Sequence, residues 1–388
     1  MKVLITTDWY KPAINGVVTS VLNLESELRS RGHEVKIVTL SQDFISRKEK
    51  NVYFLKSVNM GRLYPYARAS CFLNKTYLDE LIKWKPDIIH SQCEFSTFYV
   101  AKKISNILQI PVVHTYHTVY EDYTHYFAPS RVWSKKIVAC FSRGITNHAQ
   151  SVVVPTNKVK ELLVGYGTTT DINVIPTGIS LEKYARQYNR QTIESLKERI
   201  GISPSNKVLV AIGRLAKEKN IEELIDYFGR LQLANLCFLI VGDGPYGEEL
   251  RQYAQDSPAS DKIFFTGMVD PKEIPLYYQL GDAFVCASKS ETQGMTYIEA
   301  LASGLPVICR KDQCVDGIVC NDENGYQYET FEEYEKAVCS ILTDKIHYAE
   351  LSANAAGSVK PYSTECFAEG IENVYFRVTS QPKETRIN

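Results

Sequence analysis

The sequence predicts an α/β protein of two domains, each built around a parallel β-sheet with helices on both faces. Short apolar runs alternate with amphipathic helical patterns along most of the chain. This alternation stops near residue 178 and starts again at Lys207. The length of 388 residues also exceeds that of a typical single domain. Repeated strand–helix units of this kind form parallel sheets that bind ligands at the carboxyl ends of their strands.

The first domain is predicted to span residues 1–178. Val21, Leu24 and Leu28 show the helical spacing of its first helix, and apolar runs between turn residues mark its strands. We expect a C-terminal helical segment, about 361–388, to pack back on this domain. The predicted strands are 3–7, 35–40, 87–90, 111–115, 151–155 and 173–176, and the predicted helices are 17–31, 72–84, 96–108 and 131–148.

The second domain is predicted to span residues 179–360. The charged, weakly apolar stretch 180–205 is interpreted as the linker that precedes its first strand. The predicted strands are 207–213, 236–242, 262–267, 283–287 and 306–309, and the predicted helices are 220–233, 246–256, 271–280 and 294–303.

Composition is that of a core-forming protein, with 44% apolar and 23% charged residues. No apolar run reaches the length of a transmembrane helix, and the N-terminal residues do not resemble a signal peptide. The ten cysteines are scattered and contain no C-x-x-C pair, which is typical of thiols in a reducing compartment. We therefore expect a cytoplasmic protein.

Charge is distributed unequally between the two halves. Residues 1–175 contain 22 Lys and Arg against 14 Asp and Glu, whereas residues 176–388 contain 22 against 31. A basic first half indicates an anionic partner. Nucleic acid is disfavoured, because the chain has no zinc-finger pattern, RNA-binding signature or continuous basic run.

The most informative segment runs from Ser290 to Ile308. Glu291 lies in a polar turn, and Glu299 follows eight residues later among apolar neighbours. A buried carboxylate there needs a hydrogen-bonded partner. The backbone amides after Gly294 would open a helix whose positive end favours a diphosphate. Two carboxylates that accept bonds from sugar hydroxyls, with anion-binding amides between them, suit a nucleotide-sugar.

Two cations follow the first strand of the second domain. Arg214 and Lys219 lie in a strand-to-helix turn, where Arg can grip a diphosphate with two bonds and Lys acts as a point charge. They would stabilise charge that develops on a nucleotide leaving group. The alternative is an ordinary charged surface loop.

Gly242, Gly244 and Gly247 form a G-x-G-x-x-G pattern that resembles a dinucleotide fingerprint. The pattern follows the second strand of its domain, and the next strand ends without the acidic residue that holds a ribose of NAD. A dehydrogenase is therefore disfavoured.

Two first-domain features could meet the same ligand. Gly16 opens the first helix and could approach phosphate through its amide. His117, just after a strand, could bond a sugar hydroxyl. Together with His114 and His125 it also permits a zinc reading, but the spacing does not match a known zinc helix. Because no D-x-D motif occurs, we expect no metal site.

The helical segment 131–143 could contact a membrane. Trp133, Ile137 and Phe141 recur every four residues and are interpreted as an interfacial apolar stripe. A core helix with a solvated basic side is the alternative. The accompanying cations are Arg131, Lys135, Lys136 and Arg143.

The motifs together resemble the retaining glycosyltransferases of family 4, which have the GT-B fold of two Rossmann-like domains with parallel sheets facing across a cleft. The resemblance rests on E-x7-E, G-R-x-x-x-E-K, V-G-D-G-P, the N-G-V loop and A-S-G-L-P-V-I. It implies a hexosyltransferase that needs no metal or other cofactor. One departure is Asn15, where many members have a second glycine, so we expect a stiffer first loop.

The resemblance also implies a role for each site residue. Donor contacts are implied for Gly16, Arg214, Lys219, Glu291, Gly294, Met295, Thr296 and Glu299, and catalytic roles for His117, Arg214, Lys219 and Glu291. In particular, it assigns Glu291 to the hexose, Glu299 to the ribose and the two cations to the diphosphate.

A narrower similarity, to bacterial 1,2-diacylglycerol 3-alpha-glucosyltransferases, is carried by residues 117–126 and by the opening I-N-G-V-V-T-S-V. It implies transfer of glucose from UDP-glucose to diacylglycerol, by a peripheral protein on an anionic membrane at the inner face of the cell membrane. A polyprenyl-linked or polysaccharide acceptor is the first alternative. A UDP-sugar 2-epimerase of similar fold is the second.

Overall fold

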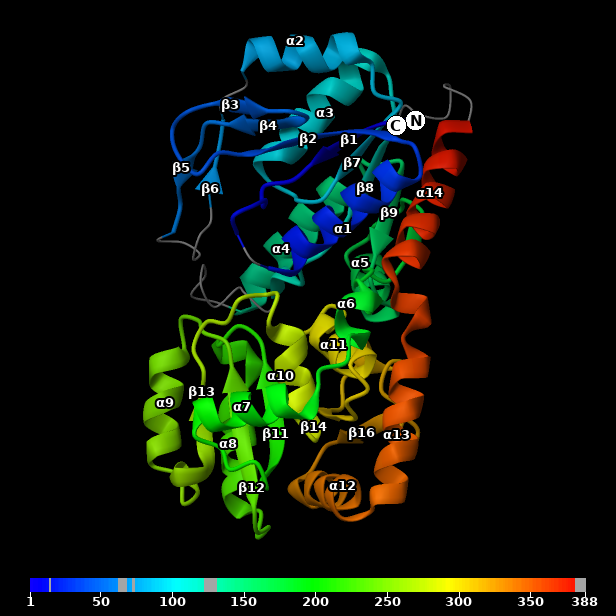
Figure 1. Cartoon of the computed structure of the whole chain (residues 1–388). Helices are drawn as coiled ribbons and strands as arrows, with labels where there is room; N and C mark the ends of the chain where they lie inside the picture. The colour runs from blue at the N-terminus through cyan, green and yellow to red at the C-terminus, as the bar shows by residue number, and fades with distance from the viewer. Residues whose placement is uncertain (14, 62–67, 72–73, 122–130, 381–388) are drawn as a thin grey trace. The chain divides into compact units, whose positions relative to one another are not determined.

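A computed structural model of the chain describes residues 1–13, 15–61, 68–71, 74–121 and 131–380, and for residues 131–134 it describes the backbone only. The chain forms two compact units (Figure 1). The first comprises Met1–Gly178 with the chain from Thr364 onward, and the second comprises Ile179–Ser363.

The first unit contains an eight-stranded sheet in the order β10-β9-β8-β7-β1-β2-β4-β3, parallel except for β3. Its central strands are nearly continuous apolar runs, as expected for a parallel sheet covered on both faces. Val3 pairs with both Val35 and Ile88, which fixes the register of the three central strands. The strands are β1 (Lys2–Thr6), β2 (Glu34–Leu40), β3 (Arg47–Glu49), β4 (Val52–Leu55), β7 (Ile88–Ser91), β8 (Val112–Thr115), β9 (Ser151–Val154) and β10 (Ile172–Val174).

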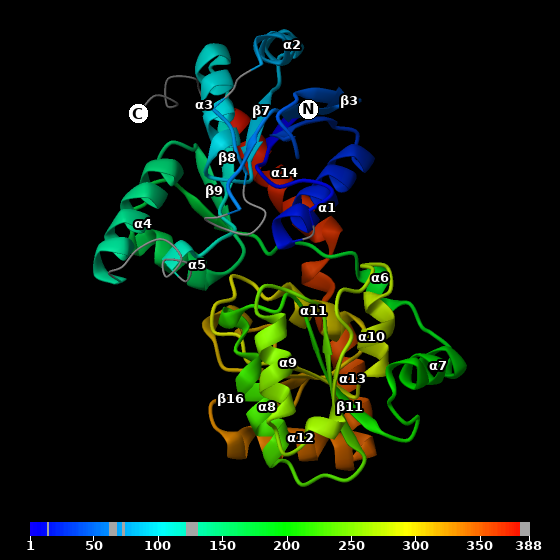
Figure 2. The ribbon, with the colours of Figure 1, turned by 90° about the vertical axis from the view of Figure 1, so that its left-hand side faces the viewer.

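Helices cover both faces of this sheet (Figure 2), and β5 (Val58–Asn59) pairs with β6 (Arg68–Ala69) in a small antiparallel sheet. The last helix packs against the first: Ile371 and Tyr375 share a buried cluster with Leu24 and Leu28. The Tyr375 hydroxyl also lies 2.6 Å from His90 Nδ1. The helices are α1 (Gly16–Ser30), α2 (Lys75–Trp84), α3 (Ser96–Leu108), α4 (Arg131–Thr146), α5 (Asn157–Gly165) and α14 (Thr364–Ser380).

The second unit contains a six-stranded parallel sheet in the order β13-β12-β11-β14-β15-β16. The burial pattern of strand β12 shows why both faces of this sheet are covered by helices. Its residues alternate between two buried clusters, with Leu239 in one and Phe238 and Ile240 in the other. The strands are β11 (Lys207–Ile212), β12 (Leu236–Val241), β13 (Ile263–Phe265), β14 (Ala283–Cys286), β15 (Val307–Arg310) and β16 (Gly325–Tyr328).

Eight α-helices of the second unit are described. They are α6 (Leu181–Ala185), α7 (Arg190–Ile200), α8 (Ile221–Arg230), α9 (Gly247–Gln255), α10 (Ile274–Leu280), α11 (Met295–Ala302), α12 (Phe331–Thr343) and α13 (Lys345–Ser358). Two Rossmann-like halves result, which confirms the predicted α/β fold class.

The prediction of a linker at 180–205 was wrong. This stretch forms α6 and α7, and both helices belong to the second unit. Their charged residues conceal a short apolar face, because Tyr184 and Leu196 are buried in the core while most of the charges face solvent. Lys197 is a buried exception, and its ammonium group donates to the Asn206 carbonyl.

Candidate active site

Two loops meet at the carboxyl edge of the second sheet. Strand β11 pairs directly with β14, so the loops that follow them are neighbours. Lys219 comes from the first loop and Glu291 from the second, and Lys219 Nζ donates to Glu291 Oε1 over 2.5 Å. Both side chains remain partly accessible, at 28% and 15%. The structure thus brings together a cation predicted to bind diphosphate and a carboxylate predicted to bind the sugar.

Arg214 lies in the same β11 loop and is oriented by its own element. Its guanidinium donates to Glu218 Oε1 over 2.5 Å. The Glu218 side chain is 7% exposed and that of Arg214 is 37% exposed. A buried carboxylate therefore holds an accessible guanidinium at the sheet edge, where it can meet an anion.

Helix α11 begins at a glycine for a steric reason. Gly294 has φ +73°, and a Cβ there would lie 2.0 Å from Cδ2 of Tyr297, whose side chain is buried. No described side chain caps this helix by a hydrogen bond. The amides of Met295 and Thr296 stand in its first turn, where backbone N–H groups lack intrahelical acceptors and the helix end is positive. This geometry suits an anionic ligand group.

Glu299 lies one turn further along α11 and meets two tyrosines. Tyr278 donates its hydroxyl to Glu299 Oε2 over 2.9 Å, and Tyr184 bonds the same carboxylate. Burial raises the pKa of Glu299 above its usual value, although both hydroxyl bonds act in the opposite direction. Further hydroxyl donors, such as those of a ribose, would therefore stabilise the ionised form.

Sequence reasoning missed both tyrosines. Tyr184 falls within the supposed linker, and Tyr278 counts only as one apolar position of the predicted helix 271–280. A usable signal was present, because a tyrosine on the buried face of a helix usually finds a partner for its hydroxyl.

The glycines of the dinucleotide-like pattern have a structural explanation. A Cβ on Gly242 would lie 2.1 Å from the carbonyl oxygen of Gly213, and one on Gly244 would lie 2.3 Å from that of Leu215. They let the β12 loop pack against the β11 loop that carries Arg214 and Lys219. The pattern supports the site without itself forming an NAD fingerprint.

In the first unit, His117 follows β8 and lies beside Gln92, which follows the adjacent strand β7. His117 Nε2 is 2.7 Å from Gln92 Oε1. Burial lowers the pKa of His117 to about 4, so the imidazole is neutral at pH 7. A neutral ring can exchange a hydrogen bond with a sugar hydroxyl without bringing a charge to the site.

Gly16 is the first residue of α1, directly after the loop from β1. The preceding residue, Asn15, caps this helix, because its side-chain oxygen accepts from the Val18 amide over 2.9 Å. Asn15, which replaces the glycine expected from the family resemblance, therefore stabilises the N-terminus of α1.

A buried group of Asp8, Glu94 and His114 at the carboxyl edge of the first unit's sheet was not predicted. Glu94 Oε2 accepts the Tyr120 hydroxyl over 2.5 Å, and Glu94 Oε1 lies 3.4 Å from His114 Nε2. Burial raises the pKa of Asp8 to about 6, although its carboxylate accepts the Thr97 amide. These side chains follow or end three adjacent strands, β1, β7 and β8, so the sheet order alone collects them.

The structure gives no support to the alternative of a zinc site. His114 and His117 have separate partners, and His125 lies outside the described residues. Within the described ranges there is no group of three or more His, Cys, Asp or Glu side chains that could hold a metal ion.

On α4, Lys135, Lys136 and Arg143 are exposed, and Lys135 Nζ forms an ion pair of 2.7 Å with Glu121. Ile137 is 64% exposed, which does not fit a core helix. Phe141 is 36% exposed and stacks on Phe95, with ring centroids 5.6 Å apart. The side chains of the other two predicted membrane residues lie outside the described part; these are Arg131 and Trp133. Of the described helices, none combines the length and apolarity required to cross a bilayer.

Comparison with known proteins identifies the class. Residues 14–183 match the family "Glycosyltransferase Family 4", and residues 192–357 match "Glycosyl transferases group 1". HepE of Anabaena, solved in complex with UDP-glucose, has the same fold, with a TM-score of 0.75 and 17% identity over 97% of this chain and all of that one. The chain belongs to glycosyltransferase family 4 and is a glycosyltransferase of the GT-B fold.

The similar relatives narrow the subgroup. The alpha-monoglucosyldiacylglycerol synthase of Acholeplasma laidlawii is 34% identical over 97% of this chain and 96% of its own length. The alpha-monoglucosyldiacylglycerol synthase of Streptococcus pneumoniae is 35% identical over 88% of this chain and 78% of its own. This confirms the resemblance inferred from the motifs.

Proposed function

We propose that this enzyme transfers glucose from UDP-glucose to diacylglycerol with retention of the α configuration, at the inner face of the cell membrane. The single observation that carries the site assignment is the Lys219–Glu291 pair, which lies beside Arg214 and the open start of α11. The acceptor and the sugar are supported by the two similar relatives, whose names specify glucosyl transfer to diacylglycerol.

The proposed donor site uses each group for what its chemistry allows. Arg214, Lys219 and the first amides of α11 hold the diphosphate, Glu291 accepts bonds from glucose hydroxyls, and Glu299 accepts them from the ribose. In the first unit, Gly16 approaches the phosphates through its backbone. Neutral His117 bonds a sugar hydroxyl.

Transfer then requires charge stabilisation more than a nucleophilic side chain. The acceptor hydroxyl attacks the anomeric carbon, the bond from that carbon to the phosphate oxygen breaks, and its electron pair passes to UDP. The donor phosphate takes the acceptor proton on the same face. Charge grows on the diphosphate as the bond breaks, so the cations bind the transition state more tightly than the substrate.

Glucosyl transfer should persist in excess EDTA. Two cationic side chains and the helix start supply the charge that a divalent ion would otherwise provide. The check is the initial rate of transfer in buffer with EDTA, compared with buffer containing Mg²⁺. Activity that EDTA abolishes and Mg²⁺ restores would contradict the metal-independent assignment.

Replacing the α4 cations with Gln should weaken binding to phosphatidylglycerol vesicles by at least about tenfold, and by more at low salt. Each Lys or Arg near an anionic surface contributes about 1 kcal/mol, screened by salt, and Lys135 is already paired with Glu121. The variant is R131Q/K135Q/K136Q/R143Q, measured by co-sedimentation at low and high salt.

The matched control removes four exposed lysines of the second unit, in the variant K272Q/K311Q/K336Q/K345Q. Its net charge changes equally, yet we expect it to keep vesicle binding. UDP affinity should stay unchanged in both variants. Equal loss in the two would mean that net charge alone, and not α4, governs attraction to the membrane.

Alternative functions are separated by one experiment. Enzyme is incubated with radiolabelled UDP-sugars, with and without diacylglycerol vesicles, and products are resolved by thin-layer chromatography. The proposal expects label in the lipid only when diacylglycerol and UDP-glucose are both present. A released sugar product from donor alone would favour the 2-epimerase, and transfer only to polyprenyl or polysaccharide acceptors would favour those alternatives.

A further inference from the structure

Three exposed apolar side chains gather in the first unit away from the site residues. Phe44 is 55% exposed, Ile45 is 64% exposed and Val58 is 43% exposed. Phe44 and Ile45 lie in the loop between β2 and β3, and Val58 is the first residue of β5, three residues after β4 ends. Because Leu40 pairs with Leu55 at the ends of β2 and β4, the two segments leave the sheet side by side. We name residues 41–46 together with 56–58 the β2–β4 tip.

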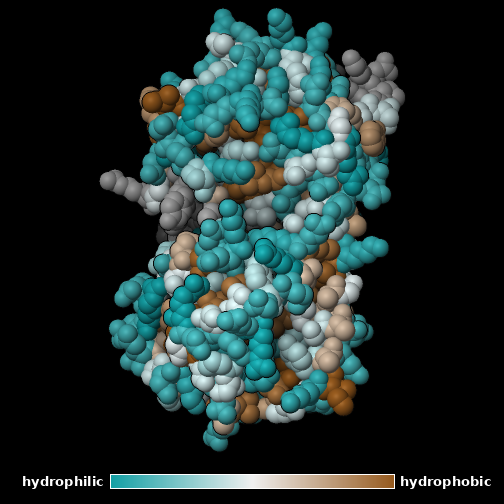
Figure 3. All heavy atoms as spheres, viewed as in Figure 1, coloured by the Kyte–Doolittle hydropathy of each residue, from teal (hydrophilic) through white to brown (hydrophobic). Residues whose placement is uncertain are grey.

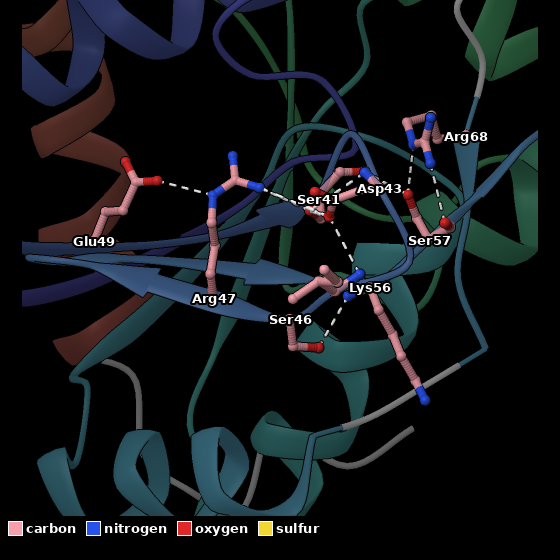
Figure 4. Close-up of polar contacts among 9 residues, drawn as sticks. Ser41, Asp43, Ser46, Arg47, Glu49, Lys56, Ser57 and Arg68 are labelled. Carbon is pink, nitrogen blue, oxygen red and sulfur yellow. Dashed lines mark hydrogen bonds and ion pairs between the residues drawn. The ribbon is translucent and has the colours of Figure 1, made fainter.

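The β2–β4 tip is a fixed structure (Figure 4). Ser57 donates its hydroxyl to the Ser41 carbonyl oxygen over 2.5 Å and its amide to the Asp43 carbonyl over 3.2 Å. The Lys56 amide donates to Ser46 Oγ over 3.0 Å. These bonds join the two segments and hold the loop that carries the apolar side chains. The loop conformation that these bonds hold therefore keeps the apolar side chains exposed. Figure 3 shows hydrophobic residues on the surface near β3 and β5.

Cations surround the apolar side chains. Lys56 Nζ lies 4.9 Å from the ring centroid of Phe44. Arg68 donates to the Ser57 hydroxyl and carbonyl over 2.6 and 3.0 Å, which fixes its guanidinium beside the tip. Between residues 41 and 58 the chain carries four Lys or Arg against two acidic residues. Arg47 pairs with Asp43 and Glu49, and Lys48 pairs with Glu80, so the basic character of the rim comes mainly from Lys50, Lys56 and Arg68. The surface is therefore apolar at its centre and basic at its rim.

We propose that the β2–β4 tip is a second membrane contact, which inserts Phe44 and Ile45 into the interface of an anionic bilayer. An aromatic and an aliphatic side chain within a basic rim match that interface, where apolar groups enter the acyl boundary and cations meet lipid phosphates. The inference rests on the proposed function in one respect, namely that the acceptor lies in a membrane.

The sheet order gives the second contact a purpose. The tip leaves the carboxyl ends of β2 and β4, and His117 follows the carboxyl end of β8 on the same edge. Four strand spacings separate β4 from β8, or about 20 Å at ~4.8 Å each. Helix α4 follows β8, so the two proposed contacts flank that edge. Attachment at two points fixes how the edge faces the bilayer, whereas α4 alone would leave it free to tilt.

The test is the double variant F44S/I45S, compared with F376S/I346S. The control also removes one exposed Phe and one exposed Ile, at 53% and 75% exposure on α14 and α13. Partition onto vesicles of phosphatidylglycerol and phosphatidylcholine is measured by co-sedimentation, with thermal melts to verify folding. We expect partition to fall at least about tenfold for F44S/I45S, because two apolar side chains lose their burial, and to stay unchanged for the control.

A gain-of-signal variant keeps the test independent of folding defects. The tryptophan of I45W should be quenched by brominated phosphatidylglycerol beyond the quenching of the unsubstituted enzyme. Unchanged partition of F44S/I45S, or no added quenching in I45W, would overturn the proposal. Transfer to short-chain diacylglycerol in solution is measured in parallel. If no variant transfers glucose to short-chain diacylglycerol, the proposed acceptor is wrong. The vesicle-binding result would still test the β2–β4 tip independently.

Discussion

Lys219→Ala is expected to lower kcat by about 10²- to 10³-fold while changing KM for UDP-glucose much less. Removing one preorganised charge-stabilising donor from an active site costs about 2.7–4 kcal/mol in the transition state. Lys219 Nζ reaches Glu291 from the loop after β11, so its charge lies where the diphosphate is proposed to bind. Steady-state kinetics with varied UDP-glucose measures the two constants separately.

Lys217→Ala is the matched control for this prediction. Lys217 lies two residues away in the same loop, but its ammonium group is directed to Glu222 and Tyr246. We expect near-normal kcat for that variant. If Lys219→Ala instead raises KM alone, the lysine binds substrate and transition state equally and the leaving-group role is wrong. A double-mutant cycle with Glu291→Gln would measure how strongly the pair is coupled.

Glu299→Gln should weaken UDP binding by about tenfold to a hundredfold. The substitution keeps the shape but loses a charged acceptor, and hydrogen bonds to charged groups contribute about 1.5–3 kcal/mol. Isothermal titration calorimetry with UDP provides the measurement. The exposed Glu249→Gln of α9 serves as control and should bind UDP normally. Unchanged affinity in Glu299→Gln would remove Glu299 from the donor site.

The same substitution should not destabilise the unliganded enzyme at neutral pH. The pKa of Glu299 is raised above its usual 4.5, so ionising it costs more in the folded than in the unfolded chain. That cost is complete above the raised pKa and disappears as the pH falls through it toward 4.5. Glu299→Gln should therefore melt at the same or a higher temperature near pH 7, with no such advantage below about pH 4.5. Affinity lost without stability lost would mark Glu299 as a residue kept for binding.

The alternation of strands and helices could be predicted because it depends on local periodicity. Helix α11 was predicted from Gly294 and the apolar run after it, and the structure gives the same start. The elements that were not predicted are strands β3, β4, β5, β6 and β16 and helices α5, α12 and α13. Helices α6 and α7 were missed because residues 180–205 were interpreted as a linker. Helix α6 has only five residues, and α7 has few apolar residues among its charges.

The site residues could be predicted from sequence motifs more readily than the residues that contact them. Glu291 and Glu299 are recognisable from their motif, but Lys219 lies 72 residues from Glu291 and Tyr184 far from Glu299 in the chain. The pairing of β11 with β14 brings Lys219 to Glu291, and the packing of α6 against α11 brings Tyr184 to Glu299. The same limit applies to Asp8 and Glu94, whose burial depends on adjacent strands that sequence periodicity does not pair.

The structure of the product decides both the acceptor and the stereochemistry of transfer. Purified enzyme is incubated with UDP-glucose and diacylglycerol vesicles, and the extracted lipid is analysed by mass spectrometry and proton NMR. We expect a monoglucosyl diacylglycerol whose anomeric proton shows the small coupling of an α-glucoside. A β-anomeric coupling would contradict retention, and the absence of any glucosylated diacylglycerol would contradict the proposed function itself.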